Sequence, residues 1–121
     1  MNNGVQEQIE IQLPPPPSLN KFYAGKHWGY RKKMADEYKG LVKEALAAFD
    51  PIHFSIFRLD IYYNHRYDCD NAILCSKFVA DALVSEGFVE NDTPTYFKSI
   101  KITYDPELEK KQFLVKIKYY E

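Results

Sequence analysis

Three runs of alternating apolar and polar residues constrain the fold of this chain more strongly than any other feature. They span residues 57–63, 97–104 and 112–120, and the last two are separated by the turn DPELEKK. Alternation with period two places successive side chains on opposite faces of an extended chain, and it is typical of a half-buried β-strand. A shorter run, from about Gln8 to Leu13, has the same pattern. The sequence therefore predicts a sheet of about four strands.

Two segments have the periodicity of α-helices. The first begins near Tyr30 and is expected to end at Asp50-Pro51, because the residue before proline disfavours helix. Its apolar stripe consists of Met34, Tyr38, Leu41, Val42, Ala45 and Phe49. The second helix is expected from about Asp70 to Ser85, ending near Gly87. Residues 14–17 are prolines, which stop strand pairing and lead into a loop.

The predicted element order is therefore βαβαββ, in a small α/β domain of the α+β type with a mixed sheet and two principal helices. The chain has 121 residues, of which 45% are hydrophobic, so residues 1–121 can form the core of one domain. No stretch approaches the roughly 20 apolar residues of a membrane span, and the polar start MNNGVQEQ is unlike a signal peptide. A cytoplasmic protein without a membrane partner is expected.

Cysteine use and charge narrow the class of protein further. Cys69 and Cys75 fit neither a disulfide framework nor a zinc-knuckle spacing, so both thiols are expected to be reduced and structural. The net charge is −1, which gives no overall attraction to nucleic acid, but its distribution is uneven. Residues 21–43 hold seven Lys or Arg against two acids, whereas residues 81–92 hold four acids and no basic residue.

The basic region predicts a phosphate-binding surface. At about 100° per residue, Lys32, Lys39 and Lys43 lie within about 20° of one another, on the side of the first helix away from its apolar stripe. Candidate DNA-binding residues are Lys21, Lys26, Arg31, Lys32, Lys39 and Lys43. The alternative is an ordinary solvated helix face.

The segment RYDCDNAILCSKFVAD concentrates charges in a stretch that otherwise resembles core. If Asp68 is still in extended backbone, it and Asp70 point to the same side. Along the following helix, Asp70, Lys77 and Asp81 lie within about 20° of a common face. Clustered carboxylates repel each other unless a hard cation such as Mg²⁺ neutralises them, and Asp92 offers another acid downstream.

This segment also allows comparison with a calcium-binding loop and with a purely structural helix start. A calcium-binding EF-hand loop is excluded, because Ala72, Ile73 and Val79 occupy positions that such a loop reserves for ligands and glycine. A purely structural alternative remains open, in which an Asp caps the helix start and Lys77 pairs with Asp81.

The ordered segments LPPPPSLNKFYAG, RYDCDN and KFVADALVSEGFVEND resemble the RusA family of Holliday junction resolvases, small endodeoxyribonucleases carried by phages and prophages. The resemblance runs from the first strand to beyond Asp92. It implies a Mg²⁺-dependent, homodimeric endonuclease that cuts branched DNA, such as a four-way junction, in recombination and repair.

Carried over to this sequence, the family's metal-binding acids fall on three aspartates: Asp68, Asp70 and Asp92. Its catalytic lysine falls on Lys77, and Asn71 and Asp81 match supporting positions. This chain departs from the family pattern in having about three extra residues between Asn71 and Lys77, and in its near-zero net charge. Two alternatives therefore stay open: a DNA-structure-binding protein without turnover, and a small soluble interaction domain.

Overall fold

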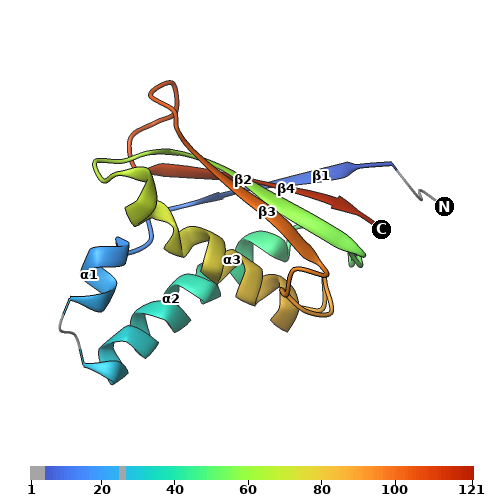
Figure 1. Ribbon diagram of the computed structural model, residues 1–121, viewed down its shortest axis with the longest axis horizontal. Helices are drawn as coiled ribbons and strands as arrows, with labels where there is room; N and C mark the ends of the chain where they lie inside the picture. Colours follow the sequence, from blue (N-terminus) through green and yellow to red (C-terminus); the bar gives the residue numbers. More distant parts are fainter. Residues whose placement is uncertain (1–4, 25–26) are drawn as a thin grey trace.

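The computed structural model describes residues 5–24 and 27–121. Figure 1 shows a sheet with helices packed beneath it. In chain order the elements are β1 (Glu7–Leu13), α1 (Leu19–Tyr23), α2 (Trp28–Leu46), β2 (Ile56–Asn64), the 3₁₀ helix η1 (Cys69–Ala72), α3 (Leu74–Ser85), β3 (Phe97–Tyr104) and β4 (Gln112–Tyr120). Within the described ranges, no helix is long and apolar enough to cross a membrane.

The sheet has the strand order β1-β4-β2-β3. β4 runs antiparallel to both β1 and β2, whereas β2 and β3 are parallel. Parallel strands need a long crossover connection, and here η1 and α3 provide it. Helices α2 and α3 cover the same face of the sheet (Figure 1). The predicted α+β class, the mixed four-stranded sheet and the four strand positions are confirmed.

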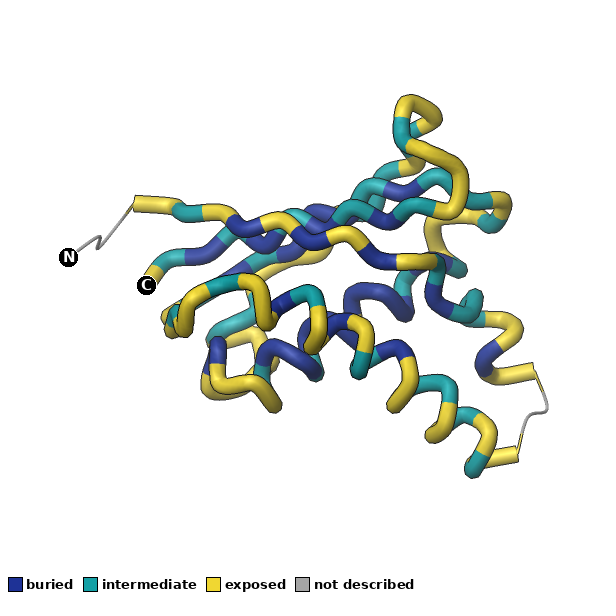
Figure 2. The backbone as a smooth tube through the Cα atoms, turned by 180° about the vertical axis from the view of Figure 1, so that it is seen from behind, coloured by how far each residue is buried: buried dark blue, intermediate teal, exposed yellow. Residues whose placement is uncertain are grey.

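The core lies between this covered face and the two long helices, where Figure 2 shows the buried backbone segments. Seven inward-facing residues of the central strands β2 and β4 are at most 1% exposed: Phe57, Leu59, Ile61, Tyr63, Phe113, Val115 and Ile117. Val42 and Leu46 from α2 and Phe78 and Leu83 from α3 complete the core from the other side. Leu41, expected in the apolar stripe, is instead 41% exposed, because it lies at the edge of the buried face of α2.

The helix expected over residues 70–85 is divided in two. Asp68 keeps an extended backbone, residues 69–72 turn as η1, and the α-helix begins only at Leu74. Its predicted end is confirmed, since Gly87 has a φ of 81°. The amides of Gly87 and Phe88 donate to the carbonyls of Val84 and Leu83, a C-terminal motif that needs a left-handed residue where glycine has no steric penalty.

The first long helix also differs from its predicted span, since it runs from Trp28 to Leu46. It ends at Leu46 because the Phe49 amide donates to the Leu46 carbonyl three residues back, which closes a tighter turn. The short helix α1 was not expected. The hydroxyl of Ser18 accepts from the Lys21 amide at 3.1 Å and so caps its first turn.

Tyrosine hydroxyls fix the proline segment to the rest of the domain. Tyr38 of α2 donates to the Pro14 carbonyl at 2.7 Å, and Tyr67, which precedes η1, donates to the Pro16 carbonyl at 2.9 Å. Prolines lack a backbone N–H but keep a carbonyl acceptor, so these bonds give the segment the partners that strand pairing would otherwise supply.

Replacing Tyr38 with Phe should lower the free energy of unfolding by about 1 kcal/mol, because the ring stays buried while its hydrogen bond is lost. For a domain of this size the melting temperature should fall by about 3–6 °C. Tyr62→Phe is the matched control, since the Tyr62 hydroxyl makes no hydrogen bond within the described residues. Equal melting temperatures for the two variants would contradict the assigned role of Tyr38.

Candidate metal and nucleic-acid site

Asp68 and Asp70 lie just beyond the carboxyl end of β2, the central strand from which the chain turns into η1. Asp68 occupies the position before η1 with φ −68° and ψ 162°, and its side chain makes no capping hydrogen bond. Asp70 lies in the first turn of η1, and both residues are exposed. Ile73, not an aspartate, precedes α3. The helix-capping alternative is therefore wrong for these two aspartates.

The hydroxyl of Tyr63 anchors the loop that leads to these aspartates. Tyr63, at the end of β2, donates to the Tyr67 carbonyl at 2.9 Å and lies 3.5 Å from the Cys69 sulfur. Burial raises the pKa of the Tyr63 phenol most, the Cys69 contact raises it further, and the charges of Asp68 and Asp70 add to the shift. Asp68 and Asp70 are thus close enough to Tyr63 for their charges to affect its pKa. The convergence of their two carboxylates stays a prediction.

Lys77 and Asp92 lie in a neighbouring cavity of about 370 Å³. Its walls include Tyr23 of α1 and Phe97 and Ile100 of β3. Lys77 also approaches Asp81 at 4.0 Å, one helical turn away, as the structural alternative expected. The side chain of Lys77 is 60% exposed, and such an exposed ion pair contributes little stability, so its ammonium is free to meet another anion. Asp70 does not share this helical face, because it belongs to η1.

Among the described residues, no group of three or more His, Cys, Asp or Glu side chains lies close enough to hold a metal ion. Asp68 and Asp70 lie near Tyr63, whereas Asp92 lines the cavity of Lys77. Magnesium commonly uses only one or two protein carboxylates and completes its shell with water and substrate phosphates. The exposed carboxylates of Asp68 and Asp70, which make no hydrogen bond or ion pair within the described residues, fit such a site.

Asn71 connects η1 to the short helix α1. Its side-chain oxygen accepts from the Asn20 amide at 3.0 Å, so η1 caps the first turn of α1. Between Asn71 and Lys77 the chain ends η1 at Ala72, passes through Ile73 and begins α3 at Leu74. The position of Lys77 is thereby set by where α3 begins.

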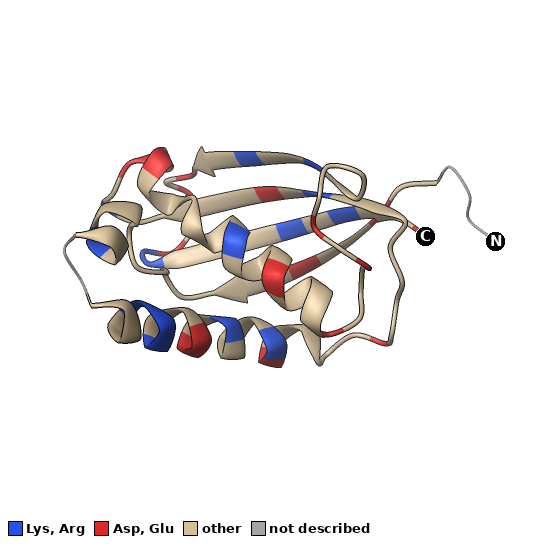
Figure 3. Cartoon of the chain, turned by 60° about the horizontal axis from the view of Figure 1, so that its bottom comes forward, with Lys and Arg blue, Asp and Glu red and all other residues tan. Residues whose placement is uncertain are grey.

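The predicted basic stripe on α2 has mixed charge (Figure 3). Asp36 lies between its lysines, 2.8 Å from Lys32 and 3.9 Å from Lys39, while Lys43 lies 3.9 Å from Glu86. The hydrogen bond from Lys32 holds the pKa of Asp36 below its usual value. Asp36 is four residues from Lys32 and three from Lys39, a helical spacing that could have revealed this neutralisation from the sequence.

The other candidate DNA-binding residues lie around α1 and the start of α2. Lys21 is exposed on α1, and the Arg31 guanidinium lies 5.5 Å from the centre of the Tyr23 ring. Lys26 falls outside the described residues.

Sequence reasoning overlooked a group of side chains beside Asp68. A cavity of about 370 Å³ is lined by Asp68 and Cys69 together with Tyr63, His65, Arg66, Tyr67 and Tyr104. The signal was the run NHRYD, whose His and Arg immediately precede the candidate acids.

Both cysteines are free, as expected. Cys75 is fully buried, and burial raises the pKa of its thiol to about 12, which suits an inert core residue.

No family model matches this chain, and no curated protein matches it in sequence.

Replacing Asn71 with Ala should speed hydrogen exchange at the Asn20 amide, because the side-chain acceptor that protects it is lost. A lost hydrogen bond of this kind is worth about 1 kcal/mol, or about a fivefold change in local opening. Asn71→Asp keeps an acceptor oxygen and should keep the slow exchange. Asn91→Ala, whose side chain accepts from the Asp92 amide instead, is the control. Unchanged exchange at Asn20 in the Asn71→Ala variant would refute the contact.

Proposed function

We propose that this protein is a Mg²⁺-dependent, structure-selective endonuclease of the RusA type that cuts branched DNA in recombination and repair. The observation that carries the proposal is the pair of exposed carboxylates at the end of β2, Asp68 and Asp70, which lack hydrogen-bond and ion-pair partners among the described residues. Two carboxylates only two residues apart repel each other, and a hard cation would remove that repulsion.

In the proposed site Asp68 and Asp70 would hold Mg²⁺. The ion, when bound, supplies charge neutralisation at a scissile phosphate and an acidified water molecule. Lys77 would place its ammonium against a non-bridging or leaving oxygen of that phosphate as a point charge, and Asp81 would orient it. Asp92 lines the same cavity as Lys77 and is assigned to the rim of the site, where it would complete the acid set of the family.

DNA would be held by the cations of α1 and the start of α2, led by Lys21 and Arg31. The lysines of α2 contribute less than the sequence predicted, because Asp36 and Glu86 partly neutralise them. A homodimer with one site per subunit would place two cuts on opposing strands of a four-way junction, as the resemblance implies.

A second candidate is a DNA-structure-binding protein of the same fold that does not cleave. It is favoured by one observation: the three aspartates do not gather into one metal-binding group within the described ranges. Cleavage of a synthetic four-way junction with Mg²⁺ separates the two candidates, and a gel shift without metal separates binding from no interaction with DNA.

Asp70→Asn should lower the rate of Mg²⁺-dependent nicking by about 100-fold or more, because one of two metal-binding carboxylates is lost. Junction binding in EDTA should stay equal or tighten, since a negative charge next to phosphates is removed. Asp50→Asn, an exposed aspartate in the loop after α2, is the control and should nick at the parent rate. Full nicking activity of purified Asp70→Asn would end the assignment of this residue to the metal.

Thermal melting tests the metal site without DNA. In EDTA, Asp70→Asn should melt at or above the temperature of the parent, because the repulsion with Asp68 is relieved. Mg²⁺ at tenfold its dissociation constant should stabilise the parent by about 1.4 kcal/mol and the variant by much less. If Mg²⁺ leaves the melting temperature of the parent unchanged, the carboxylates do not form a metal site in the free protein.

A further inference from the structure

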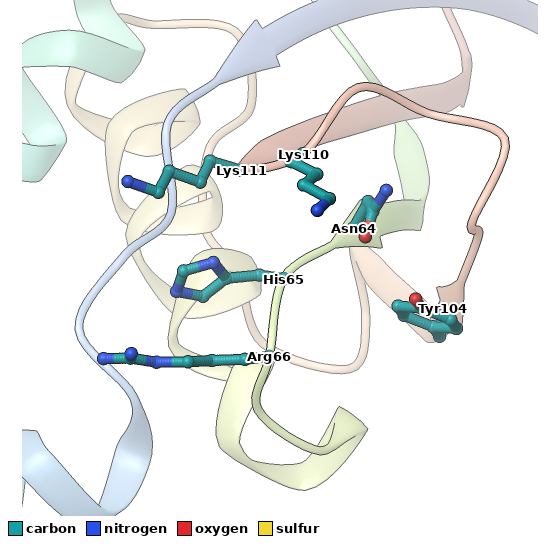
Figure 4. A pocket seen from close by; sticks show the side chains of 6 residues that line it. All are labelled: Asn64, His65, Arg66, Tyr104, Lys110 and Lys111. Carbon is teal, nitrogen blue, oxygen red and sulfur yellow. The ribbon is translucent and has the colours of Figure 1, made fainter.

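A second cavity opens next to the one that contains Asp68, and basic side chains dominate its wall. It has a volume of about 430 Å³ and is lined by Asn64, His65, Arg66, Tyr104, Lys110 and Lys111. None of these lining residues is acidic. Figure 4 shows the side chains of Lys111, His65 and Arg66 extending side by side in the same direction. The cations come from two places in the sequence, the end of β2 and the turn between β3 and β4.

Three hydrogen bonds hold these two places together. The Lys111 amide donates to the Asn64 carbonyl at 2.6 Å, and the Asn64 side chain donates to the Leu108 carbonyl at 2.8 Å. The Asp105 amide donates to the Tyr63 carbonyl at 2.8 Å. The turn is therefore anchored on β2 at three points, and the lysines that it carries lie in fixed positions relative to His65 and Arg66.

The backbone at Lys111 adds a further observation. Lys111 has a φ of 66°, a left-handed conformation that glycine adopts without steric cost and that is unfavourable for a residue with a side chain. Residues kept in such conformations cluster at active sites, ligand-binding sites and switch regions. At this position the chain carries a lysine whose side chain lines the cavity.

The residues that line this cavity carry positive charges and no negative charge. Burial lowers the pKa of His65 most, and the neighbouring cations Arg66 and Lys111 lower it further. The acids of the β3–β4 turn, Asp105, Glu107 and Glu109, are not among the lining residues. A cavity with several cations and no lining acid attracts an anion with several oxygens, such as a phosphate group.

We infer that this cavity binds a backbone phosphate of a nucleic-acid strand. Arg66, Lys110 and Lys111 supply charge and N–H donors for the phosphate oxygens. Tyr104, 50% exposed and set edge-on to Tyr63, offers an aromatic surface for the adjoining base or sugar, which a free phosphate ion would not use. His65, Arg66 and Tyr104 also line the cavity of Asp68, so a strand bound here leads to the candidate metal site. The phosphate site depends only on the residues that line this cavity. The further statement that the bound strand is the one that is cleaved rests on the proposed function.

The test compares two double variants that each lose two positive charges. Lys110→Gln with Lys111→Gly removes both turn lysines, and glycine at 111 suits the left-handed backbone, so the fold is retained. Lys98→Gln with Lys101→Gln removes two exposed lysines from β3 that do not line the cavity. Binding of a single-stranded DNA oligonucleotide and of a four-way junction is measured in EDTA over a range of salt concentrations.

The turn variant should bind DNA at least about tenfold more weakly, and the slope of log affinity against log salt should fall by one to two units. The β3 variant should keep the parent slope. The turn variant and the parent should bind with equal affinity to an oligonucleotide that has an uncharged methylphosphonate backbone. Equal losses in both double variants, or an unchanged slope in the turn variant, would overturn the inference.

Titration with inorganic phosphate tests whether the cavity binds a phosphate of DNA or a free phosphate ion. In the parent, DNA should shift the NMR signals of the His65 ring at concentrations far below those that inorganic phosphate needs, and neither should shift them in the turn variant. If phosphate shifts His65 as readily as DNA does, the cavity is a free-anion site and the inference of a strand is overturned. If DNA binds and shifts His65 but no junction is cut with Mg²⁺, the phosphate site stands and the endonuclease proposal fails.

Discussion

The burial of β2 is the constraint on which the rest of the structure depends. This strand pairs with β4 on one side and β3 on the other, and its four inward-facing residues are at most 1% exposed. A strand that is paired on both edges and buried on one face cannot shift register without moving its apolar side chains into water. Its carboxyl end is therefore fixed, and Asn64, His65, Arg66, Asp68 and Asp70 follow directly from it.

Tyrosine rings and hydroxyls connect this rigid strand to the irregular segments around it. Tyr63 and Tyr38 bury their rings in the core and donate from their tips to carbonyls of the loop before η1 and of the proline segment. Tyr67 does the same from the loop itself. A buried ring with a polar tip can satisfy a loop carbonyl at the edge of a core, where an aliphatic side chain would leave it unpaired. The loops that carry the candidate acids are held in this way.

Charges of opposite sign are separated over a short distance beside the end of β2. Asp68 and Asp70 lie on the side of η1, and the cations of the neighbouring cavity lie on the side of the β3–β4 turn. On α2, by contrast, Lys32 and Lys39 share Asp36 and form an ordinary mixed helix surface. Among the described residues, the charged groups on both sides of this strand end form no ion pair with each other. Such groups are better suited to binding ions and phosphates than to stabilising the fold, to which exposed pairs contribute little.

The sequence by itself determined the α+β class, the strands and the end of α3 at Gly87, because alternation, helical periodicity and glycine are local signals. It also singled out the acids that follow β2. It did not predict the break between η1 and α3. It also missed α1, a single short turn that is capped locally by Ser18 and, from a distant part of the sequence, by Asn71. The neutralisation of Lys43 by Glu86 and the meeting of His65 and Arg66 with Lys110 and Lys111 were decided by tertiary structure alone. Those residues are far apart in the chain, and only the packing of α3 against α2 and the pairing of β2 with β4 bring them together.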